Sequence, residues 1–137
     1  MFTNKTFSGE TMDRAYAEMR TRWEPLHEMT QIKGDEETHP LLSPDDEFAD
    51  FERWDVANLS GTAAKEDSML QYEHTRSALK LGLELGEELG ANPYKFGLIG
   101  ASDAHTGIAT TREENYFGKY QHTEPSPDRH NREVIPA

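Results

Sequence analysis

The sequence contains no cysteine among its 137 residues. A disulfide framework and a thiolate metal site are therefore excluded, because both need the cysteine sulfur. Any metal bound by this chain must be held by histidine, aspartate, glutamate or water.

Positive charge is scarce. The chain has 14 Lys and Arg residues against 26 Asp and Glu, which gives a net charge of -12. A surface of this sign repels nucleic-acid phosphates and anionic lipid, so we expect neither nucleic acid nor a membrane surface as a partner. Divalent cations are the more natural ligands.

Long apolar runs are also missing. Hydrophobic residues make up 34% of the chain, and no stretch approaches the roughly 18 apolar residues of a membrane span. The N-terminal residues 1–5 lack the apolar core of a signal peptide. We therefore expect a cytoplasmic protein with a thin core. No internal repeat, Walker phosphate loop or G-x-G-x-x-G fingerprint is present.

The N-terminal half predicts one strand between two helices. Apolar residues at helical spacing predict a helix capped by Thr11 and running to Trp23, with Pro25 ending it. Alternation over residues 26–33 predicts a strand closed by Gly34. Ser43, Pro44 and the acids after them predict a short helix through residue 54, and residues 55–67 are expected to form a loop.

The C-terminal half predicts a long helix followed by a strand. The leucine-rich segment 68–89 predicts a helix that stops at Gly90, and residues 95–100 predict a strand. The order of strand, helices and strand is typical of a right-handed parallel crossover unit. We expect residues 1–9 to be a flexible leader, residues 10–119 the domain, with a last helix over 110–117, and residues 120–137 a disordered tail.

The second predicted strand ends in an Asp-x-His pair, Asp103 and His105, flanked by glycines and small residues. In parallel α/β proteins, functional side chains gather where strands end. Carboxylate and imidazole suit zinc, manganese or iron, so the pair is a candidate metal site. The alternative is that Asp103 caps a turn and His105 is a solvated loop residue.

Further candidate ligands lie on and after the first strand. Glu28 lies on it, and Glu36, Glu37 and His39 follow it, so adjacent strand ends would present acids and imidazoles to one another. The alternative is a surface acid pair and a histidine held rigid by Pro40. The remaining histidines have no ligand partner at helical spacing, and we expect them on the surface: His27, His74, His122 and His130.

Two blocks, residues 23–34 with their continuation 37–52, and residues 92–107, resemble the C-terminal part of the domain of unknown function 3604 family. That family is similar to the polymerase and histidinol phosphatase (PHP) superfamily of metal-dependent phosphoesterases. The resemblance implies a distorted (β/α) barrel whose strand ends hold two or three divalent metals. Asp103 and His105 match the last metal-binding motif of that superfamily, and Glu28, Glu37 and His39 lie in a family block.

The chain departs from that pattern in two ways. No two of its six histidines are two positions apart, so the His-x-His pair that opens such a site is missing. A closed barrel also needs on the order of 200 residues. We therefore expect a partial (β/α) barrel-like α/β fragment with two short parallel strands and three to four helices.

The leading hypothesis is the C-terminal part of a PHP-like hydrolase of phosphoesters or related esters, inactive without a complementing N-terminal part. A second hypothesis is an acidic non-catalytic module. Such a module would bind a partner through the apolar strip of residues 68–89, or self-associate along exposed strand edges.

Overall fold

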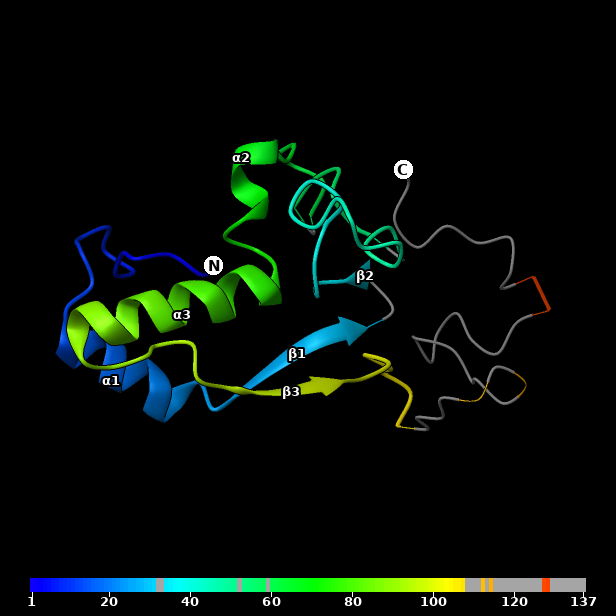
Figure 1. Ribbon diagram of the computed structural model, residues 1–137. Coiled ribbons are helices and arrows are strands. Elements are labelled where there is room, and N and C mark those ends of the chain that lie inside the picture. Colours follow the sequence, from blue (N-terminus) through cyan, green and yellow to red (C-terminus); the bar gives the residue numbers. More distant parts are fainter. Residues whose placement is uncertain are drawn as a thin grey trace.

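Two parallel strands distant in sequence form the centre of the molecule (Figure 1). The computed structural model describes residues 1–31, 34–51, 53–58, 60–107, 112, 114, 127 and 128. Their sheet has the strand order β2-β1-β3, with β1 parallel to β3 and antiparallel to β2. The elements in chain order are α1 (Arg14–Trp23), β1 (Leu26–Gln31), β2 (Gly34–Asp35), α2 (Asp67–Leu70), α3 (Thr75–Leu89) and β3 (Gly97–Gly100).

The mixed α/β class and the parallel pair are as the sequence predicts, and β2 is an addition to them. Helices α1 and α3 pack together at one end of the long strand pair (Figure 1). Within the described residues the sheet has two edges, β2 and β3. The predicted last helix and tail fall almost wholly outside those residues. None of the described helices is long and apolar enough to cross a membrane.

Helix α1 begins two residues later than Thr11 suggests. Asp13 is the N-cap, and its side chain accepts a hydrogen bond from the backbone N–H of Tyr16 at 2.8 Å. Thr11 instead forms an isolated antiparallel bridge with Lys5. An aspartate at this position satisfies one of the backbone donors that the first turn leaves without a partner.

The predicted helix over residues 68–89 is broken. α2 ends at Leu70, and His74 has extended backbone angles, with φ -104° and ψ 142°. The Nδ1–H of His74 donates to the carbonyl oxygen of Leu70 at 2.9 Å, taking the acceptor that the backbone N–H of residue 74 would use in a continuous helix. The break turns His74 into the N-cap of α3, which ends as expected at Gly90, in the left-handed region at φ 73°.

The predicted helix over residues 44–54 is wrong, and residues 40–51 form successive turns. The side chain of Asp46 accepts from the backbone N–H of Phe48 at 3.0 Å and also binds Arg76 of α3 at 2.7 Å. A short polar side chain bonded to nearby backbone in this way competes with helix formation. Phe48 and Phe51, on these turns, are exposed.

The core lies between α1, α3 and the residues around them. It consists of Phe2, Met12, Ala17, Ala78, Leu85 and Tyr94. Phe2 is 3% exposed and donates its backbone N–H to the carbonyl oxygen of Tyr72. The first nine residues, expected to be a loose leader, therefore include part of the core.

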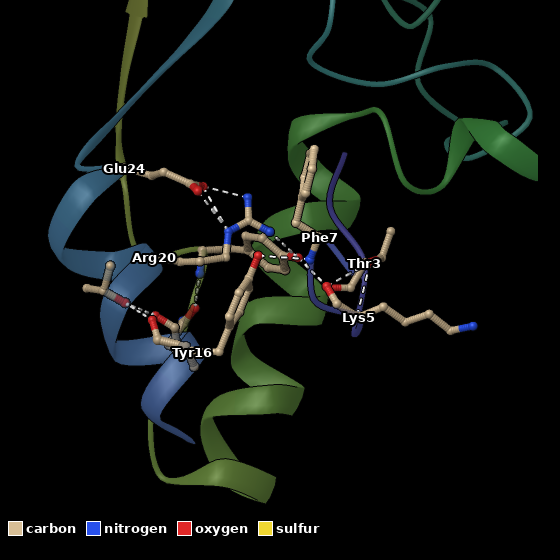
Figure 2. A network of polar contacts seen from close by, with 10 residues as sticks. Thr3, Lys5, Phe7, Tyr16, Arg20 and Glu24 are labelled. Atoms are coloured by element: carbon tan, nitrogen blue, oxygen red, sulfur yellow. Dashed lines mark hydrogen bonds and ion pairs between the residues drawn. The ribbon is translucent and has the colours of Figure 1, made fainter. Parts of the chain in front are cut away.

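A polar network fastens the N-terminal segment to α1 (Figure 2). Arg20 donates from Nε to both carboxylate oxygens of Glu24, and from Nη1 to the hydroxyl of Tyr94 at 3.1 Å. The Tyr94 hydroxyl donates in turn to the carbonyl oxygen of Thr3. The Tyr16 hydroxyl accepts from the backbone N–H of Phe7 at 3.0 Å. Together these bonds hold residues 3–7 against the helix pair.

Candidate functional site

The carboxyl ends of β1 and β3 lie side by side. Thr30 is paired with Gly100, and the backbone N–H of Ala101 donates to the carbonyl oxygen of Thr30 at 3.0 Å. A Cβ on Gly100 would lie 2.9 Å from the Thr30 side chain, so glycine permits this close approach. The loop after β3 therefore starts beside the end of β1.

Asp103 and His105 occupy that loop, close to one another. The Nδ1–H of His105 donates to the carbonyl oxygen of Asp103 at 2.7 Å, and the same nitrogen lies 3.8 Å from Asp103 Oδ1. Asp103 has φ 50°, the one described residue other than glycine in the left-handed region. Because a carbonyl can only accept, Nδ1 carries a proton.

Glu28 lies on β1 opposite Ile99 of β3, and is half-buried. Its Oε2 lies 3.4 Å from the side-chain amide nitrogen of Gln31, a long hydrogen bond. Glu28 is thus on the strand that leads to the candidate site, at the start of the sheet irregularity between residues 28 and 30.

Glu37 is bound to α3. Its Oε1 accepts from Nε and Nη2 of Arg76 at 3.0 and 2.6 Å, and its carbonyl oxygen accepts from the Arg76 backbone N–H. The carbonyl oxygen of Glu36 accepts from the Thr75 N–H in the same way. Glu37 therefore completes the N-terminus of α3 and ion-pairs with it.

His39 is buried, at 4% exposure, in a network of its own. Its Nδ1 accepts from the backbone N–H of Leu41 at 3.1 Å, so the proton is on Nε2, which donates to Asp55 Oδ2 at 2.9 Å. Arg53 also donates to Asp55 Oδ2. The hydrogen bond from His39, and next the charge of Arg53, hold the pKa of Asp55 below its usual range despite partial burial.

The five predicted ligands do not converge. In the described part of the chain, no three His, Asp or Glu side chains form a group that could hold a metal ion. Asp103 and His105 are together, whereas Glu37 and His39 are engaged by Arg76 and Asp55. Ligation by any of the five residues stays a prediction.

Two histidines expected on the surface are enclosed. The side chain of His27 is 12% exposed, and its ring packs 5.1 Å from Phe2 and 5.2 Å from Phe96. His74 is 7% exposed and packs against His39 at 5.7 Å. Burial lowers the pKa of both imidazoles. The alternation of residues along β1 could have indicated that His27 is enclosed. No sequence signal indicated the helix break at His74.

A cavity of about 260 Å³ lies where β1 ends and β2 begins. Glu36, Trp54, Lys65, Glu73 and His74 are among the residues that line it. Sequence reasoning missed this group, because its members come from four separate segments with no shared motif.

A family model described as "Protein of unknown function (DUF3604)" matches residues 1–136. Comparisons with curated proteins and with solved structures found no match. The match covers both sequence blocks that carry the resemblance, the strand ends and the loop of Asp103 and His105. On that extent of agreement, the chain belongs to the DUF3604 family of proteins of unknown function.

Proposed function

We propose that this chain is the C-terminal part of a PHP-like, metal-dependent hydrolase of phosphoesters or related esters. The observation that supports it most directly is the hydrogen bond from His105 Nδ1 to the carbonyl oxygen of Asp103. Histidines that bind metals usually donate their other ring N–H to a carbonyl or carboxylate, which fixes the tautomer and the ring orientation.

The donor set fits a divalent metal. The imidazole of His105 and the carboxylate of Asp103, two residues away, are ligand types that zinc, manganese and iron accept. A bound metal would lower the pKa of water and polarise a phosphoryl or ester oxygen. Asp103 and His105 would hold it, and Glu28, on the adjacent strand, is the nearest acid in the register to orient water.

Glu37 and His39 have a weaker claim within this proposal. For His39 to coordinate a metal, it would have to give up its bond from Leu41 or its bond to Asp55. For Glu37, the competing partner is the guanidinium of Arg76. The bonds to Asp55 and Arg76 are charge-assisted, and such bonds are about twice as strong as neutral ones.

The test is NMR of the imidazole Cε1–H signals of the six histidines during titration with Mn²⁺ or Zn²⁺. We expect Mn²⁺ to broaden the His105 signal first and Zn²⁺ to shift it. Asp103→Asn and His105→Ala should each weaken this response at least tenfold. Asp67→Asn, which alters an exposed carboxylate in the first turn of α2, is the matched control.

Equal broadening of all six signals, or an unchanged response in both variants, would count against the metal site. Binding is expected to be weak, because a catalytic metal normally has about three protein ligands and an open position.

A second candidate is the non-catalytic module that associates with itself or a partner. It is favoured by the exposure of apolar side chains on the edge strand β3, where Leu98 is 45% and Ile99 is 46% exposed. Leu83 of α3 is also exposed. An apolar edge strand presents unpaired backbone groups that template strand pairing.

Light scattering with and without Mn²⁺ or Zn²⁺ separates the two candidates. Dimers that form without metal and are abolished by Ile99→Lys favour the module. A monomer that metal stabilises against unfolding favours the remnant metal site. Val56→Lys, at another exposed apolar residue, is the matched control.

A further inference from the structure

The cavity beside β1 and β2 is lined by separate segments of the chain. They are Met1, the strand ends around Gln31 and Asp35, the residues around Trp54, Lys65, and the turn before α3 with Glu73 and His74. Its volume of about 260 Å³ is slightly below the roughly 300 Å³ at which pockets for drug-sized ligands begin. It therefore suits a ligand of few heavy atoms.

The charge on these walls is negative. Asp35, Glu36 and Glu73 contribute carboxylates, and Lys65 is the opposing side chain. Met1 also lines the cavity, and burial lowers the pKa of its amino group. Three carboxylates against two amines leave a negative excess even with both amines protonated. Partial burial raises the pKa of Glu36, as expected of a carboxylate short of counter-charge.

His74 supplies an independent sign of a ligand. The residue is 7% exposed and lines the cavity, and its Nδ1–H donates to the Leu70 carbonyl. Because burial lowers the pKa of His74, the ring is neutral and its lone pair is on Nε2. A ligand N–H in the cavity can donate to that atom.

The contacts of Lys65 show which chemical groups the residues lining this cavity can bind. Its ammonium lies 2.8 Å from Glu73 Oε2 and donates to the carbonyl oxygen of Trp54 at 3.2 Å. The indole N–H of Trp54 donates to the Ala57 carbonyl at 2.9 Å, which fixes this aromatic wall. Carboxylates, a neutral imidazole and an aromatic ring together favour a cation that carries N–H donors and a short apolar part.

We propose that this cavity binds a small organic cation with N–H donors, a primary ammonium or guanidinium compound, held by the carboxylates of Glu36 and Glu73 and by Nε2 of His74. The proposal uses neither Asp103 nor His105. A test of this proposal is therefore independent of a test of the metal site.

Trp54 is the reporter for the test. The chain has two tryptophans, and Trp23 is exposed, so Trp23→Phe leaves a single fluorophore in the cavity wall. In this background we expect n-butylammonium to change the fluorescence saturably, with a Kd of about 1 mM. The neutral isostere 1-butanol should give no saturable change. Tetramethylammonium, a cation without N–H donors, should bind at least tenfold more weakly.

Charge variants distinguish binding from a loss of structure. Glu73→Gln should weaken n-butylammonium binding about tenfold, because a charge-assisted bond is lost. Lys65→Met should strengthen it, because the competing ammonium is removed. A purely structural disturbance would weaken binding in both variants. Glu88→Gln, at an exposed position of α3, is the matched control and should change nothing.

Several results would overturn the proposal. They are the absence of saturable n-butylammonium binding, equal binding of 1-butanol, and weakening by Lys65→Met as well as by Glu73→Gln. Displacement of n-butylammonium by micromolar Mn²⁺ in the Asp103→Asn variant would assign the cavity to a metal instead. Normal amine binding in His105→Ala supports the proposal and separates its outcome from that of the hydrolase.

Discussion

Nε2 of the buried His39 donates a hydrogen bond to Oδ2 of Asp55 over 2.9 Å, linking two turn segments that share no regular secondary structure. Arg53 donates to the same oxygen, and the His39 ring lies against that of His74. This network connects the 38–43 turns, the segment at 53–55 and the start of α3. Through His74, this network also reaches the wall of the cavity.

Asp55→Ala should lower the free energy of unfolding by about 2 kcal/mol, because it removes a hydrogen bond to a charged group and leaves the His39 donor buried. Urea denaturation measures the change. Asp50→Ala is the control: its ion pair with Arg53 is exposed and should contribute less than about 1 kcal/mol. Equal losses in the two variants would contradict the role given to Asp55.

The same carboxylate predicts an acid dependence. Because the folded-state pKa of Asp55 is depressed, its contribution to stability is present above the unfolded pKa of about 3.9. It is lost as the pH falls through the folded value. Between about pH 5 and pH 3, the wild-type chain should therefore lose more unfolding free energy than Asp55→Ala does.

His27→Phe should flatten the dependence of stability on pH near neutrality. Burial lowers the folded-state pKa of His27, so the unfolded chain binds its proton first as the pH falls below about 6.5. Stability then declines with falling pH until the folded pKa is reached. Phe in its place keeps the aromatic contacts with Phe2 and Phe96 and has no proton to bind. Thermal unfolding from pH 7.5 to pH 5.5 measures the slope, and an unchanged slope would refute the assignment.

Gly82 and Gly86 of α3 should respond oppositely to alanine. A Cβ on Gly82 would lie 2.9 Å from Tyr94 Cβ and closer still to Asn92 Oδ1, which accepts from the Tyr94 N–H. Overpacking of this kind costs about 1–3 kcal/mol. At Gly86 the nearest atom, Asn92 Cβ, is 3.4 Å away, so Gly86→Ala should stabilise by about 0.5–1 kcal/mol through helix propensity. Chemical denaturation of both variants tests the pair, and losses of similar size would show that the approach at Gly82 is not specific.

The chain alone should hydrolyse p-nitrophenyl phosphate no faster than buffer with the same metal. The described residues supply one acid and one imidazole at the strand ends, short of the ligand set of a catalytic metal. Product release at 405 nm with Mn²⁺ or Zn²⁺ measures this. Rapid turnover abolished by a chelator would show that the site is complete without an N-terminal part.

The sequence predicts best the elements governed by local rules. α1, the parallel strands and the stop at Gly90 follow from apolar spacing, proline and glycine. The DUF3604 membership was also readable from two sequence blocks. Each of these signals lies within a short stretch of sequence, and here tertiary contacts do not change the secondary structure that it predicts.

The failures have a common cause in long-range partners. The helix expected at residues 44–54 is replaced by turns in which Asp46 bonds to Phe48 and to Arg76, thirty positions away. The helix break at His74 and the burial of His39 depend on one another, because their rings pack together. The cavity group comes from separated segments, and only the folded chain brings it together. Asp103 and His105 lie close together because two residues so near in sequence need no such help, and their role as metal ligands stays a prediction.

The pairing of Leu26 with Gly97 has a consequence for synthesis on the ribosome. The two residues are 71 positions apart (97 minus 26), so at about 5–20 residues per second the β1 segment waits roughly 4 to 14 seconds for its parallel neighbour. During that interval its backbone donors and acceptors face water or other nascent chains. Expression at lower temperature or with added chaperone should therefore raise the yield of folded protein more than a faster translation rate would.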